Sequence, residues 1–155
     1  GRVRRTPGPN AAYGCYAQLG ADDVGLRVAV DLLVALMEEP FFDELRTKKQ
    51  IGYSVSCGVK WTCGVVGMEW HVVSAVMKPS EIEAAVDAFL ASWPSKMASL
   101  DVEEWDEAVK GLAREKSEPF DSVADEAEFL HGEVTSGRRA WGVVRDEVAA
   151  LRQLL

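Results

Sequence analysis

Residues 51–76 read IGYSVSCGVKWTCGVVGMEWHVVSAV and contain the clearest strand pattern of the chain. Over residues 51–59 every second residue is aliphatic, aromatic or cysteine, and the residues between them are glycine or serine. Alternation with a period of two is typical of a strand that buries one face. A turn predicted near Lys60 then leads to a second long strand, expected over 63–76. The two runs predict an antiparallel hairpin.

Helices are predicted on both sides of this hairpin, because apolar residues recur at three- and four-residue steps beside capping residues. Before the hairpin we expect a strand over 11–18, a helix capped by Asp22 or Asp23 that runs to about Glu38, and a short helix from Pro40 to near Gln50. After it we expect a helix begun by Ser80 and Glu83 that Pro94 kinks or ends, one begun by Asp101 and Glu104 that Pro119 breaks, one from Val123 to Val134, and one over 146–155.

This order of elements predicts an α+β fold in which helices cover one face of an antiparallel sheet. Residues 10–155 are expected to form a single domain. Residues 1–9 contain two prolines and three arginines and predict a flexible arm or linker. The chain begins without methionine and its last helical pattern ends without a cap, so we expect it to be a fragment of a larger chain.

The charge of the chain limits its partners. Its 17 Lys and Arg against 25 Asp and Glu give a net charge of −8, which argues against binding nucleic acid or an anionic membrane. Three cysteines are too few for a disulfide framework. Cys57 and Cys63 lie on either side of Lys60, so a cross-strand bridge and two reduced thiols are both compatible with the sequence. Sparse cysteines favour a cytoplasmic location.

The two histidines give weak signals for a metal site. Glu69 and His71 share a strand face. This arrangement is typical of a metal-binding or base pair, and equally of a charge pair on a solvated sheet face. His131 follows Glu128 by one helical turn, which fits a surface histidine equally well. His-x-x-Glu-His and its inverse, which place two imidazoles one turn apart beside a carboxylate, do not occur in the chain. We therefore predict no metal ligand in this sequence.

Residues 40–55, PFFDELRTKKQIGYSV, are the densest unusual segment. A basic helix end carrying Arg46 leads through a glycine into a strand that opens on Tyr53. The guanidinium and the phenol are both donors that suit a carbonyl oxygen gaining negative charge. The alternative is a basic helix end that complements the helix dipole, with Tyr53 on the core face beside Ile51 and Val55.

Residues 41–53, FFDELRTKKQIGY, resemble the "LRTxxQLGY" signature of the insulysin/pitrilysin family of inverted zincins, in its last homologous domain. Lys78-Pro79 and the later Ala88-Phe89-Leu90 are similar to further stretches of that family. The resemblance implies a zinc metalloendopeptidase built from four homologous α+β domains in two halves around a chamber.

The same resemblance implies the role of this chain. It would be the zinc-free C-terminal domain, which contributes Arg46 and Tyr53 to bind the backbone of a peptide substrate. The zinc would belong to the N-terminal catalytic domains of the same polypeptide, and this fragment alone would be inactive. A non-catalytic scaffold or binding subunit of the processing-peptidase superfamily is the open alternative.

Overall fold

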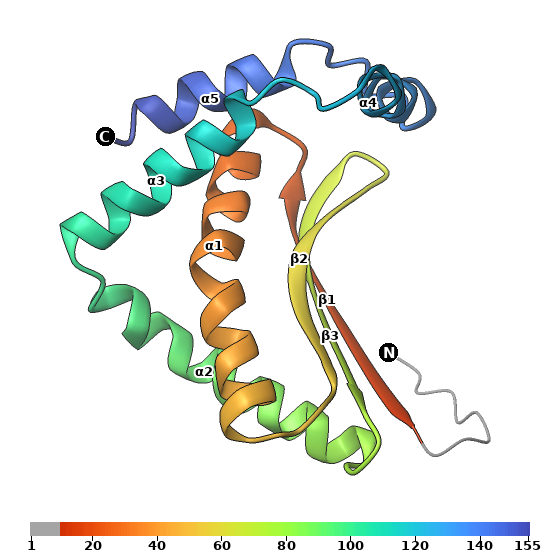
Figure 1. The fold of residues 1–155 in the computed structure, drawn as a ribbon, viewed down its shortest axis with the longest axis vertical. Helices are drawn as coiled ribbons and strands as arrows, with labels where there is room; N and C mark the ends of the chain where they lie inside the picture. The colour runs from red at the N-terminus through yellow and green to blue at the C-terminus, as the bar shows by residue number, and fades with distance from the viewer. Residues whose placement is uncertain (1–9) are drawn as a thin grey trace.

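The computed structural model describes residues 10–155, so the predicted arm over 1–9 lies outside the described residues. The fold is α+β, as predicted, with three strands and helices on one side of them (Figure 1). The elements in chain order are β1 (Ala11–Ala21), α1 (Val24–Phe42), a π-helix (Asp43–Lys48), β2 (Ser54–Thr62), β3 (Val65–Ser74), α2 (Pro79–Ala98), α3 (Val102–Ser117), α4 (Val123–Thr135) and α5 (Val143–Arg152).

The sheet is antiparallel, with the strand order β1-β3-β2. Its hairpin turn is Cys63-Gly64, where both residues have positive φ, at 53° and 75°. The prediction of a turn near Lys60 was therefore wrong by three residues, because the two-residue turn with glycine second sets the register. In that register Cys57 lies opposite Trp70 rather than Cys63. All three cysteines are free, so the bridge left open by the sequence does not form.

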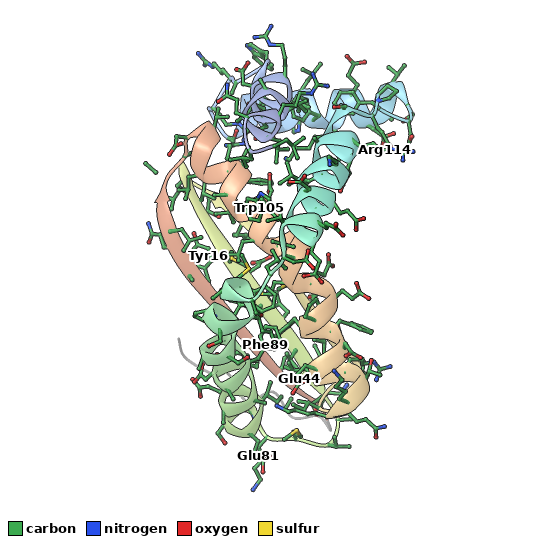
Figure 2. The ribbon with its side chains drawn as sticks, turned by 90° about the vertical axis from the view of Figure 1, so that its left-hand side faces the viewer. Tyr16, Glu44, Glu81, Phe89, Trp105 and Arg114 are labelled. Atoms are coloured by element: carbon green, nitrogen blue, oxygen red, sulfur yellow. The ribbon has the colours of Figure 1, made fainter. Side chains whose placement is uncertain are left out.

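The main core fills the space between one face of the sheet and helices α1 and α2. Met68 and Val72 of β3 point into it, and Phe41 of α1 meets Phe89 of α2 edge to face at 5.1 Å between ring centroids. Figure 1 shows no helix on the opposite face of the sheet formed by the described strands. Figure 2 views the helices from outside and labels Phe89 on α2 and Trp105 on α3. One sheet face is thus open.

The prediction of a new helix from Pro40 was wrong, and of the two outcomes predicted at Pro94, a kink or an end, the end is excluded. Pro40 lies within α1 and Pro94 within α2, and each helix continues past its proline. A proline inside a helix removes one backbone hydrogen bond, so burial must compensate. Phe41 and Leu45 are fully buried beyond Pro40, and Trp93 is buried beside Pro94. Each such buried side chain contributes about 1.5–3 kcal/mol, which is similar in size to the cost of about 3 kcal/mol for an interior proline.

Two of the three predicted caps are confirmed. The Asp23 carboxylate accepts from the Leu26 N–H at 3.1 Å, and Asp101 accepts from the Glu104 N–H at 2.7 Å. The predicted start of α2 at Ser80 was wrong. Proline at the first helical position sets the start instead, and the Lys78 N–H donates to Glu81 at 2.7 Å.

Helices α3 and α5 pack on the end of α1 through a small apolar cluster and a buried ionic network. Arg27 of α1 pairs with Asp22 and lies 3.3 Å from Glu147 of α5. Lys116 of α3 lies 2.6 Å from Asp31 and 2.9 Å from Glu147. None of the sequence patterns predicts this network, which joins residues up to 120 positions apart. None of the helices described over 10–155 is long and apolar enough to cross a membrane.

Candidate functional site

The segment that carries Arg46 is a π-helix rather than the short helix predicted from Pro40. It continues α1 over Asp43–Lys48, and Leu45 at its centre is fully buried. The wider turn brings residues five apart into contact: Asp43 pairs with Lys48 at 2.7 Å and Glu44 with Lys49 at 3.2 Å. The carboxylate of Asp43 raises the pKa of Lys48 above its usual value. Arg46, between these pairs, is exposed.

The connection from the π-helix to β2 is tight. Gln50 has a φ of 51°, which turns the chain so that the Ile51 N–H donates to the Leu45 carbonyl at 2.9 Å. Gly52 then lies against β3, and a Cβ at this position would stand 2.6 Å from the Val73 carbonyl oxygen. Only glycine fits this approach without moving the backbone. The contact fixes the distance between this connection and β3.

Arg46 is anchored at this connection. Its Nη1 donates to the Gly52 carbonyl oxygen at 3.1 Å. A guanidinium has five N–H donors, and within residues 10–155 the other four have no hydrogen-bond partner. One hydrogen bond therefore orients the group while its remaining donors face solvent, where they can bind a second carbonyl oxygen.

Tyr53 is half exposed, at 52 %, so of the two alternatives left open by the sequence the one that places it on the core face does not hold. Ile51 and Gly52 are both buried, because the backbone of Gly52 itself packs on β3. The chain bends at Tyr53, and alternation begins only at Ser54, where β2 starts rather than at Ile51. The Tyr53 hydroxyl accepts from the side-chain amide of Asn10 at 3.1 Å. Its own O–H remains able to donate.

The geometry brings the two predicted site residues to one end of the sheet. Arg46 bonds the carbonyl of Gly52, and the peptide unit of that carbonyl contributes the N–H of Tyr53, which donates to Val73 at 3.0 Å. Both side chains are exposed there. Asn10 joins them, although the sequence gives no sign of it, because it lies 43 positions from Tyr53. We define this set, Arg46, Gly52, Tyr53 and Asn10, as the donor cluster.

The other sequence candidates lie away from the donor cluster. On the open sheet face, Glu69 lies 3.5 Å from His71 and 3.3 Å from Lys60. Partial burial opposes ionisation of Glu69, but its bonds to His71 and Lys60 outweigh that effect and lower the pKa of the carboxyl. His131 is exposed on α4. In the part of the chain that the structure describes, no three metal-binding side chains lie close enough to hold an ion.

Several known proteins share sequence or fold with this chain. Residues 32–131, more than half of the chain, match the family described as PQQ synthase PqqF-like, C-terminal lobe domain 4. The chain is 28 % identical over 145 residues to "Insulin-degrading enzyme-like 1, peroxisomal" of Arabidopsis thaliana. The match covers 94 % of this chain and 15 % of that relative. Against human insulin-degrading enzyme the identity is 25 % over 145 residues, with 94 % of this chain and 14 % of the relative covered.

Solved structures show the fold. Pitrilysin superposes with a TM-score of 0.81 at 20 % identity, over 96 % of this chain and 16 % of that one. The periplasmic protease PqqL of Escherichia coli gives 0.69 at 13 % identity, over 97 % and 17 %. The chain thus spans about a sixth of the proteins that it matches. The family match, together with these relatives, identifies the chain as a member of the PqqF-like family, a C-terminal domain of the insulinase-type metallopeptidases.

Proposed function

We propose that this chain is the zinc-free, substrate-binding domain of a zinc metalloendopeptidase, and that Arg46 and Tyr53 grip the backbone of the peptide. The observation that carries the proposal is the donor cluster: an anchored guanidinium, four of whose donors have no partner among residues 10–155, one peptide unit from an exposed phenol. Membership of the insulinase family supplies the reaction class.

The donor cluster suits recognition of a main chain rather than of particular side chains. Peptide carbonyl oxygens are acceptors, and the free groups of Arg46 and Tyr53 are donors. A donor aimed at a carbonyl oxygen that gains negative charge during hydrolysis is stronger in the transition state than in the bound substrate. The positive charge of Arg46 adds to this, since charge-assisted hydrogen bonds are about twice as strong as neutral ones.

We place the zinc in another part of the polypeptide. The described residues offer no set of three ligands, so no step of the reaction is assigned to a metal on this chain. Because the chain covers only 15 % of a peptidase relative such as the peroxisomal Arabidopsis protein, residues 10–155 are proposed as one domain of a longer chain. Its partners would be peptide substrates and the N-terminal catalytic domains, without nucleic acid or membrane.

The fragment alone would be inactive, because the reacting metal and the water that it activates belong to the other domains. When those domains close, a peptide would meet the donor cluster and the metal together, so that enclosure and hydrolysis are coupled. For the compartment we propose the cytoplasm, supported by three cysteines that are all free.

The test uses the full-length protein and a quenched fluorescent peptide. We expect Arg46→Gln and Tyr53→Phe each to lower kcat/KM by roughly 10² to 10³, as removal of one preorganised donor does. The zinc content, measured by atomic absorption, should not change. Lys48→Gln is the control, because Lys48 lies in the same π-helix and is exposed but bonds only Asp43. It should retain wild-type turnover.

Wild-type turnover in both variants would overturn the assignment of the donor cluster. The native reading frame offers a second check. If it lacks His-x-x-Glu-His upstream of this domain, the peptidase proposal fails and a non-catalytic scaffold or binding subunit takes its place.

A further inference from the structure

The three strands carry only three ionisable side chains of the kind that changes or holds charge near neutral pH, and these lie together on the open face of the sheet. They are Lys60 of β2 and Glu69 and His71 of β3. Oε2 of Glu69 lies 3.3 Å from Nζ of Lys60 and 3.5 Å from Nε2 of His71. We define these residues as the sheet cluster. Alternation along the strands places mostly small residues around it on the same face: Ala12, Gly14, Ser54, Ser56, Gly58 and Gly67.

Glycines let two rings lie flat on the sheet beside these charges. A Cβ at Gly14 of β1 would stand 3.4 Å from Nδ1 of His71, so the imidazole extends over the backbone of β1 with Nε2 toward Glu69. A Cβ at Gly67 would stand 2.7 Å from Cζ of Tyr16, so this ring crosses β3 above the residue that pairs with Lys60. The missing side chains therefore set where the imidazole and the phenol lie.

The charges of the sheet cluster favour an acidic ligand. Glu69 is the most covered of the three side chains, at 27 % exposure against 49 % for Lys60 and 53 % for His71, and its carboxylate already faces both of them. An ammonium has three N–H donors, and Glu69 is the only ion-pair partner of Lys60 among residues 10–155. A basic ligand would meet the repulsion of Lys60, whereas a carboxylate would find donors that are still exposed.

The sheet cluster lies within reach of a peptide held by the donor cluster. The Val73 carbonyl accepts the Tyr53 N–H, and His71 and Glu69 precede Val73 on β3 by two and four residues. At about 3.4 Å per residue these steps correspond to about 7 and about 14 Å. An extended peptide has the same rise. Its side chains about two to four residues from the gripped bond would therefore come level with the sheet cluster.

We propose that Lys60 and His71 bind an acidic side chain of the peptide substrate, about two to four residues from the bond that the donor cluster grips. This inference rests on the proposed function and adds selectivity for a side chain to a site that otherwise recognises the main chain. Exposed ion pairs are weak, so the expected preference for the acidic peptide is about two- to fivefold in kcat/KM.

The test uses the full-length protein and pairs of quenched fluorescent peptides that are identical except for Glu or Gln at one position. That position is moved one residue at a time along the peptide. We expect the wild type to prefer the Glu peptide at one position or at two neighbouring positions. Lys60→Gln and His71→Gln should each bring the ratio of the two kcat/KM values closer to one. The ratio is measured because it cancels any change in activity that both peptides share.

Two further variants make the comparison specific. Lys110→Gln is the matched control, because Lys110 is an exposed lysine of α3 that also pairs with one carboxylate, that of Asp106, at 3.4 Å. It should keep the wild-type ratio. Lys60→Glu reverses the charge beside Glu69, so it should prefer a peptide with Lys over one with Gln at the same position.

The proposal is overturned if the wild type prefers Glu at no position, if it prefers Lys there, or if Lys60→Gln leaves the ratio unchanged. Binding of the same peptides is also measured by fluorescence anisotropy, with a zinc chelator present to stop hydrolysis. Better binding of the Glu peptide that depends on Lys60, in a protein that cleaves neither peptide, would contradict only the proposed function. Turnover that depends on Arg46 and Tyr53 but shows no preference for Glu would contradict only the role of the sheet cluster. A protein that binds neither peptide would overturn both.

Discussion

Gly52 positions Arg46 within the donor cluster. Its carbonyl oxygen orients Arg46, and its missing side chain lets the segment lie against β3. Because a Cβ would stand 2.6 Å from the Val73 oxygen, which is backbone, a larger residue must push the segment at Gly52 away from β3. The same residue thus serves both packing and the position of the guanidinium.

We expect Gly52→Ala to destabilise the protein by about 1–3 kcal/mol, the usual cost of overpacking. Urea unfolding followed by circular dichroism would measure it. Gly58→Ala is the matched control, since it lies in the neighbouring strand β2 and a Cβ there meets no atom within 4 Å. Equal stability in the two variants would contradict the close approach at Gly52.

Residue patterns predicted part of the candidate site and missed the rest. The donor types of Arg46 and Tyr53 were readable from the sequence, and both are exposed. The alternative with Tyr53 in the core followed from strand alternation, which treats each buried position as a buried side chain. At Gly52 the backbone itself is buried, so the alternation does not extend to Tyr53. The bond from Asn10 to Tyr53 joins distant segments, so no local pattern could show it.

At the scale of elements, α5 is held by charge as well as by apolar contact. Glu147 accepts from both Arg27 and Lys116, and all three side chains are largely buried. Removing one charge from a buried network leaves the opposite charges undercompensated, which costs more than the loss of an exposed pair.

We expect Glu147→Gln to lower the free energy of unfolding by about 3 kcal/mol. Asp106→Asn is the control: Asp106 pairs with Lys110 one turn away on α3, at 3.4 Å, and this more exposed pair should contribute less than about 1 kcal/mol. Thermal unfolding of both variants gives the comparison. A loss at Glu147 no larger than that at Asp106 would show that the network does not hold α5.

The types of most elements were predictable, but several boundaries were not. Helical periodicity and the Asp23 and Asp101 caps located the starts of α1 and α3 correctly, but α1 ends at Phe42 rather than near Glu38. The continuation of α1 and α2 past their prolines was not predictable, because the burial that compensates them is a tertiary effect. The hairpin turn was misplaced because alternation was followed only as far as Lys60, and Cys63, which has a positive φ in the turn, is not a residue typical of that position.

At the scale of the whole molecule, the order of strands and helices was enough to predict the α+β class with helices on one face. The exposure of α4 was not predictable. Its periodicity equals that of a helix packed on its own domain. Only the structure shows that Val123, Leu130 and Val134 are exposed among the described residues.

The ionic network makes the stability of the whole domain depend on pH. The bonds from Arg27 outweigh the burial of Asp22 and hold the pKa of its carboxyl below its usual value of 3.8. A lowered pKa stabilises the folded state above the unfolded value, and this contribution is lost as the pH falls through the folded pKa. Burial has the opposite effect on Asp31, whose pKa is raised although Lys116 opposes the shift.

We therefore expect Asp22→Asn to be less stable than the wild type at neutral pH. The difference should stay constant down to the usual pKa of 3.8 and shrink below it. Urea unfolding at a series of pH values from about 7 to about 3 measures both curves. A difference that grows as the pH falls would contradict the sign of the shift.

Asn10 stands at the point where the polypeptide enters β1, and its amide holds the phenol of Tyr53. A single hydrogen bond of this kind contributes only about 1 kcal/mol, far less than the packing of the strand behind it. A force applied to the backbone at Asn10 would therefore break this hydrogen bond before it separated β1 from β3.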